Sequence, residues 1–160
     1  MIDTQAIIAT LAQTPNIIIP LVRETPQVNL RRQPAPGKWS VHEHACHLAL
    51  VHPIMSDRLE KMLSENVPLL TPYEPSRDEQ EGSLLDMDLD DSLNAFRSDR
   101  EALLTRLREL ESDQWARTAE HPEYSHYSIF IMFRHLAMHD MFHAYRIEEL
   151  LLNPNWNVRD

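Results

Sequence analysis

Residues 128–152 read SIFIMFRHLAMHDMFHAYRIEELLL, and this stretch decides the fold. Its apolar residues recur every three or four positions, the spacing that places side chains along one face of an α-helix. The stripe is formed by Ile129, Met132, Leu136, His139, His143, Ile147 and Leu150. Asn153 and Pro154 end the helix, because a proline disfavours helical backbone in the residue before it. The stretch therefore predicts a long helix whose core-facing stripe includes two histidines.

Two further helices are predicted by stripes and capping residues. One covers residues 3 to about 24, with Asp3 as its N-cap. We expect a kink or short break near Pro15, because proline removes a backbone donor and crowds the preceding turn. Another begins near Asp88, and its stripe is the most regular in the chain: Leu89, Leu93, Phe96, Leu103, Leu107 and Leu110.

The remaining long helix is predicted from Val41 to about Ser64. Ser40 and Glu43 form a capping box, in which each side chain satisfies a free backbone donor of the first turn. Residues 26–38, 65–86 and 111–127 are predicted connectors, and the long second one is a candidate to close over a pocket. Only two residues are glycine, which argues against tight hairpins and phosphate-binding loops. The sequence thus predicts an all-α four-helix bundle.

Composition narrows the class of protein. The 160 residues are enough for one domain, expected over 1–160, and 42% hydrophobic residues are ordinary for a globular chain. The net charge of −10 disfavours nucleic acid as a partner. There is no run of eighteen apolar residues, no signal-peptide pattern, and a single cysteine, Cys46, which excludes an internal disulfide. We therefore expect a cytoplasmic protein without a membrane partner.

The histidines give the first indication of a function. His139 and His143 are four residues apart in the predicted core stripe, so both rings project from one face and can reach one metal ion. The spacing alone is equally consistent with core-edge histidines bonded to carboxylates. His47 strengthens the metal interpretation, because it lies one turn before Val51 on the core face of the second helix. His44 is near the same face but less central.

Three imidazoles leave a coordination position open, as in catalytic metal sites. Nitrogen ligands favour zinc, nickel, iron or copper over magnesium or calcium. The sequence therefore predicts a divalent metal site formed by His47, His139 and His143. We expect His42 and His52 to face solvent, since both fall off the apolar stripe.

Other residues near the predicted site have simpler interpretations. His135 is expected at the core edge or behind the ligands, and Asp140 is expected to be solvated or paired. Arg58 and Arg146 are candidates to bind a substrate carboxylate, although outward salt bridges are the favoured interpretation. Trp39 and Trp115 are expected to be packing residues. Cys46 is expected to be a small buried residue.

Three motifs in this order resemble the DinB-like superfamily, which includes the YfiT-type metal proteins. They are residues 36–40 (PGKWS) with Glu43 and His47, the connector with Trp115 and His121-Pro122, and residues 135–143 (HLAMHDMFH). The resemblance covers nearly the whole chain. It implies an up-down-down-up bundle, often dimeric, with a metal ion held by one histidine of the second helix and two of the fourth. These correspond to His47, His139 and His143.

The resemblance also implies an activity. Members of known activity use a low-molecular-weight thiol, as S-transferases or as an isomerase, whereas many members have none assigned. His52-Pro53 stands where relatives often carry an acidic residue, and Ser125 where a glycine is common, so the substrate stays open. We expect a metal-dependent enzyme that joins a thiol to a small electrophile. The alternatives are a metal-dependent hydrolase, a non-catalytic metal- or ligand-binding stress-response module, and a bundle without metal.

Overall fold

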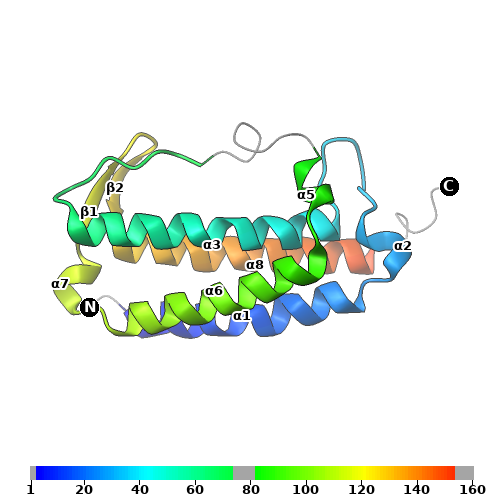
Figure 1. Cartoon of the computed structure of the whole chain (residues 1–160), viewed down its shortest axis with the longest axis horizontal. Coiled ribbons are helices and arrows are strands. Elements are labelled where there is room, and N and C mark those ends of the chain that lie inside the picture. The colour runs from blue at the N-terminus through cyan, green and yellow to red at the C-terminus, as the bar shows by residue number, and fades with distance from the viewer. Residues whose placement is uncertain (1–2, 74–81, 154–160) are drawn as a thin grey trace.

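The computed structural model describes residues 3–73 and 82–153 (Figure 1). Its long helices are α1 (Thr4–Glu24), α3 (Val41–Ser64), α6 (Leu89–Arg108) and α8 (Ile129–Leu152). The connectors contain the short helices α2 (Gln27–Leu30), α5 (Ser83–Asp86) and α7 (Ser112–Trp115), and the strands β1 (Thr118–His121) and β2 (Tyr124–Ser128). The long helices begin and end within two residues of the predicted positions. Residues 74–81 of the second connector and Pro154 lie outside the described residues.

The helices form an up-down-down-up bundle, as predicted. In Figure 1, α1 and α8 run in one direction and α3 and α6 in the other. Helix α1 packs most extensively on α8, and α3 on α6. Because α3 and α6 are consecutive long helices that run parallel, the chain must return along the bundle between them. This return explains why the connector that starts at residue 65 is so long.

Side-chain caps fix the helix starts. Asp3 accepts a hydrogen bond from the Ala6 amide at 2.9 Å, and Ser128 accepts one from the Ile131 amide at 3.2 Å. Ser40 and Glu43 form the predicted capping box at the start of α3. These short-range contacts satisfy amides that have no partner within the helix, which is why the boundaries are readable from the sequence.

Of the kink or short break expected near Pro15, the break is wrong, because α1 continues through this residue. A proline in a helix leaves the carbonyl four residues earlier without its usual amide donor. Here that carbonyl belongs to Leu11, and it accepts a hydrogen bond of 2.7 Å from Arg100 of α6. A donor from a neighbouring helix therefore replaces the missing one, and the helix is maintained.

Low glycine content argues against tight hairpins, but that prediction is wrong for the 111–127 connector. Strands β1 and β2 form an antiparallel hairpin in which Ala119 is paired with Tyr127 and His121 with Tyr124. The turn contains Pro122 and Glu123 and needs no glycine. Threonine and tyrosine favour strands, and Thr118, Tyr124 and Tyr127 were the available signal. The hairpin leads directly into α8 and brings two tyrosines over the bundle.

Buried apolar side chains from all four long helices make the core, in two clusters along the bundle.

Helix α1 is also long and apolar enough, by length and composition alone, to cross a membrane. The same composition is expected of a core helix, and α1 packs on α8 and α6 through buried residues such as Leu11 and Ile18.

Candidate metal centre

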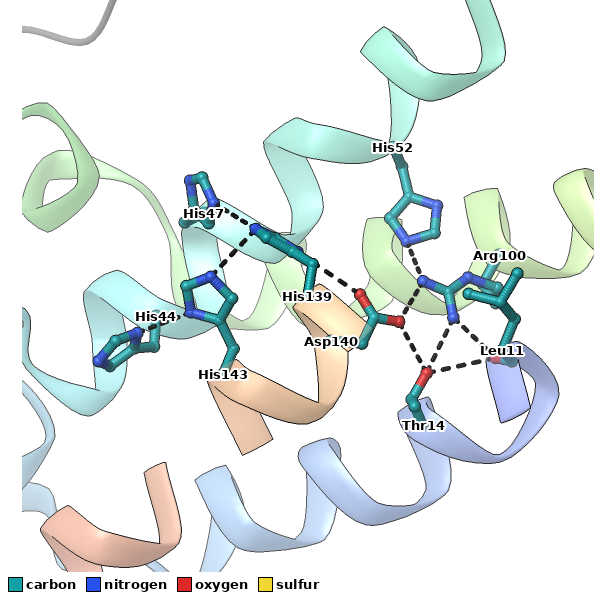
Figure 2. A network of polar contacts seen from close by, with 9 residues as sticks. All are labelled: Leu11, Thr14, His44, His47, His52, Arg100, His139, Asp140 and His143. Carbon is teal, nitrogen blue, oxygen red and sulfur yellow. Dashed lines mark hydrogen bonds and ion pairs between the residues drawn. The ribbon is translucent and has the colours of Figure 1, made fainter. Parts of the chain in front are cut away.

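The three predicted ligands converge between α3 and α8 (Figure 2). The Nε2 atom of His139 is 3.1 Å from Nε2 of His47 and 3.1 Å from Nε2 of His143. One ligand nitrogen from each of the three rings lies within 4.8 Å of the others. The structure thus brings together the residues that the spacing and the resemblance selected.

This geometry fits a metal ion better than a network of hydrogen bonds. In a tetrahedral site with metal–nitrogen distances near 2.05 Å, two ligand nitrogens are about 3.3 Å apart. In a neutral imidazole, Nε2 carries either one proton or one lone pair, so Nε2 of His139 can make one well-directed hydrogen bond but not one to each neighbour. A cation between the three nitrogens can accept a lone pair from every ring. The observed nitrogen spacing is therefore suited to one divalent ion.

Burial keeps two of these rings in the neutral form that binds metals. Desolvation lowers the pKa of His47 to about 3, with a further contribution from the neighbouring His139. The pKa of His143 is lowered even further by the same causes. Both rings are therefore neutral at physiological pH, so a metal ion does not have to displace protons from them.

His44 contacts the triad from behind. Its Nδ1 atom is 2.8 Å from Nδ1 of His143, on the side of the ring opposite the cluster. When Nε2 of His143 binds an ion, its proton is on Nδ1 and is donated to His44. Partners of this kind fix the orientation and tautomer of a ligand ring. The sequence placed His44 near the core face, and the structure shows it as a support for His143.

A buried ion pair lies on the other side of the triad (Figure 2). Arg100 of α6 and Asp140 of α8 form a salt bridge of 2.6 Å, and each side chain is 1% exposed. Arg100 also donates to Thr14 Oγ1 at 2.9 Å and to His52 Nε2 at 2.8 Å. Thr14 donates to the same Asp140 oxygen at 2.8 Å. The network joins all four long helices next to the candidate metal site.

Asp140 links this network to a ligand. Its second oxygen, Oδ1, is 3.9 Å from Nδ1 of His139, and neither atom has a hydrogen-bond partner among the described residues. Burial raises the pKa of Asp140, but the polar contacts with His139, Arg100 and Thr14 outweigh it and hold this pKa below its usual value. A charged carboxylate thus faces the nitrogen of His139 that is turned away from the cluster.

Three sequence-based assignments need correction. His42 and His52 are buried rather than solvent-facing: His42 donates to the Leu84 carbonyl at 3.1 Å, and His52 accepts from Arg100. Helix α3 packs against α5, α6 and α8, so more than one of its faces is covered. Trp39 is a wall of the site rather than only a packing anchor, because its ring stacks on His143 with centroids 5.9 Å apart.

A cavity of about 360 Å³ opens beside the triad, which is large enough for a small molecule. Aromatic side chains form much of its wall: Trp39, Tyr73, Tyr124, Tyr127 and Phe142. The exposed His135 also lines this cavity, outside the cluster of three nitrogens. Arg58 lines the cavity as well, and the outward salt bridge predicted for it is not present among the described residues. Arg146 does pair outward, with Glu149.

Comparison with known proteins agrees with this fold. The model of the DinB superfamily matches residues 10–147, so the chain belongs to the DinB superfamily. Among solved structures, the chain is similar to YfiT from Bacillus subtilis, described as a probable metal-dependent hydrolase with an unusual four-helix bundle topology. That match has a TM-score of 0.82 and 23% identity, and it covers 92% of this chain and 85% of YfiT.

A second similar structure is a conserved protein from Enterococcus faecalis. Its TM-score is 0.68 at 13% identity, over 95% of this chain and 98% of the other. Among curated proteins, none matches the chain. At these identities the structural likenesses establish the fold.

Proposed function

We propose that this chain is a metal-dependent enzyme that acts on a small molecule. His47, His139 and His143 would bind one divalent ion, of zinc, nickel or iron. The observation that carries the proposal is the convergence of three Nε2 atoms, with contacts of 3.1 Å, at the wall of a 360 Å³ cavity. A structural metal site is normally closed by a fourth protein ligand, whereas this cluster faces a cavity.

A divalent ion held there would lower the pKa of a bound water or thiol and so supply a nucleophile at neutral pH. The protein's own residues shape the site around it. His44 and Asp140 face the outer nitrogens of two ligand rings and hold their orientation. Trp39 and Phe142 give the cavity apolar walls beside the cluster, which limit water next to the reacting atoms.

A low-molecular-weight thiol is the nucleophile that we favour. Apolar and aromatic walls suit a polarizable sulfur. Coordination to a metal ion would lower the pKa of the thiol, so the thiol would lose its proton without a protein base. Among the described residues that line the cavity, Glu123 is the single carboxylate, and it is exposed on the hairpin turn. The reaction would form a carbon–sulfur bond to an electrophilic carbon and release the leaving group and one proton.

Hydrolysis is the second candidate function, and it has its own support. The neutral ring of His135 lines the same cavity, where it is able to accept a proton from water. Burial lowers the pKa of His135, with a smaller contribution from His139. The description of YfiT as a probable metal-dependent hydrolase points in the same direction. A non-catalytic metal-binding module is the remaining alternative.

A paired assay separates these candidates. Tag-free protein loaded with zinc, nickel or iron is mixed either with a thiol and an activated aryl halide or with an activated ester. We expect thioether formation that His143→Ala removes and that His126→Gln, at an exposed histidine, leaves unchanged. Ester hydrolysis without thioether formation would favour the hydrolase. No turnover in either assay, together with a large loss of stability in His143→Ala, would favour the non-catalytic module.

A further inference from the structure

We propose that the cavity binds an elongated anionic substrate, with its carboxylate at Arg58 and its reacting end at the three histidines. This inference deepens the proposed function and relies on it only for the reacting end. The anion site itself depends on Arg58 and on the side chains around it.

Helix α3 places a histidine ligand and a cation on one wall of the same cavity. His47, Val51, Met55 and Arg58 follow each other at intervals of four, four and three residues, and all four line the cavity. These intervals keep side chains on one face of a helix. The wall therefore runs from a candidate metal ligand, across two apolar side chains, to a guanidinium group.

The guanidinium of Arg58 has N–H donors available for a ligand. One nitrogen donates to the Thr71 carbonyl at 2.5 Å, and, against the larger effect of burial, the Arg58 guanidinium lowers the pKa of the Tyr127 phenol beside it. Arginine has five N–H donors, and the ion pairs found among the described residues involve other cations and not Arg58. Glu123 is exposed, whereas Arg58 is half-buried. The cation thus has neutral partners and no described counter-charge.

A ligand that covered this arginine without neutralising it would be poorly bound. Removing a cation from water is costly unless it gains an anionic partner, and a planar guanidinium binds carboxylates through two parallel hydrogen bonds. The other titratable groups nearby do not supply that partner. Desolvation lowers the pKa of His121, and the charge of Arg58 lowers it further, so this ring is neutral. Burial raises the pKa of Tyr127, so the phenol keeps its proton.

The distance between the two ends sets the length of the substrate. Arg58 lies 11 residues after His47 on α3. At 1.5 Å per residue that is about 16 Å along the helix axis. Both side chains lean toward the N-terminus, but the arginine is the longer one and can reach further back, which gives a separation of roughly 10–15 Å. Val51, Met55 and Leu136 line the cavity between these ends and are apolar. A carboxylate joined to the reacting atom by about four to eight methylene groups, or by an aromatic ring and a short chain, spans such a distance.

A series of ω-mercaptoalkanoic acids and the matching amides tests this proposal. Each compound carries a thiol at one end and either a carboxylate or a neutral amide at the other, with three to ten methylene groups between them. Calorimetry measures their affinity for the metal-free and the cobalt-loaded protein, and the visible spectrum of cobalt reports thiol binding independently. The variants are Arg58→Gln, Arg58→Lys and, as a matched control, Arg97→Gln at an exposed position of α6.

In both metal states, we expect the parent and Arg97→Gln to bind carboxylates about 10- to 100-fold more tightly than the amides, the range for a charge-assisted hydrogen bond. Arg58→Gln loses this preference and Arg58→Lys keeps part of it, which separates loss of charge from damage to the fold. The cobalt-loaded parent also shows an affinity maximum at intermediate chain length, and this maximum disappears in Arg58→Gln.

Equal affinity for acids and amides in the parent, or a carboxylate preference that survives in Arg58→Gln, would overturn the proposal. An affinity that rises steadily with chain length in parent and variant alike would do the same. Failure of the protein to bind cobalt, with the Arg58-dependent preference intact in the metal-free state, would remove the proposed metal function and leave the anion site supported.

Discussion

The network of Arg100 and Asp140 makes a strong prediction about stability. Arg100→Leu leaves a buried carboxylate without its ion-pair partner and removes the donor that satisfies the Leu11 carbonyl beside Pro15. Breaking a buried ion pair from one side typically costs about 3–5 kcal/mol. In a chain of this size that corresponds to a fall in melting temperature of roughly 6–20 °C.

Urea unfolding in the presence of a chelator measures this cost, because a chelator removes any contribution of bound metal to the free energy of unfolding. Arg97→Leu, on the exposed face of the same helix, should stay within about 0.5 kcal/mol of the parent. The double variant Arg100→Leu/Asp140→Leu should be more stable than Arg100→Leu alone, since neither charge is then left unpaired. The reasoning is refuted if Arg100→Leu costs less than about 1 kcal/mol or if the two substitutions simply add.

Three further predictions concern the histidines. Because His52 has a folded-state pKa of about 3 against 6.5 unfolded, its contribution to stability is complete above pH 6.5 and declines toward pH 3. In chelator-treated protein, the unfolding free energy of the parent should therefore rise with pH between pH 4 and 6 more steeply than that of His52→Gln, by about 1.4 kcal/mol per pH unit, and equal slopes would contradict this. His44→Phe should weaken zinc affinity by about 10- to 100-fold in a competition titration, and unchanged affinity would exclude its supporting role. Zinc at 100 times its dissociation constant should stabilise the parent by about 2.7 kcal/mol and leave His139→Ala unaffected; equal stabilisation of both proteins would place the ion elsewhere.

The helix boundaries could be predicted because they depend on short-range sequence features. Caps such as Asp3 and the Ser40–Glu43 box act within one turn of the helix, so the sequence marks them directly. The triad was predictable for a related reason, because His139 and His143 share a helix face and His47 lies on the apolar stripe of another helix. The up-down-down-up order came from the family resemblance, and the helix directions confirm it.

The features that were missed depend on which helices face each other. His52 was assigned to solvent because it falls off one stripe of α3, yet α6 covers that face and supplies Arg100. A signal was present in α6 itself, since Arg100 stands four residues after Phe96 and three before Leu103, in the core stripe. Sequence spacing cannot show that the partner of this buried cation is Asp140, 40 residues later.

Several predictions stay predictions. No contact in the structure bears on the homodimer, the cytoplasmic location or the absence of nucleic-acid and membrane partners. The extent of the domain over 1–160 and the identity of the metal ion and of the thiol also stay predictions. Apart from the extent of the domain, each depends on groups or molecules that lie outside a single chain.

Elemental analysis asks whether His47, His139 and His143 hold one metal ion. Tag-free protein is purified beside the double variant His139→Ala/His143→Ala and a His126→Gln control. We expect about one equivalent of zinc, nickel or iron in the parent and the control, and little in the double variant. No metal in the parent after incubation with each ion, or equal metal in the parent and the double variant, would contradict it.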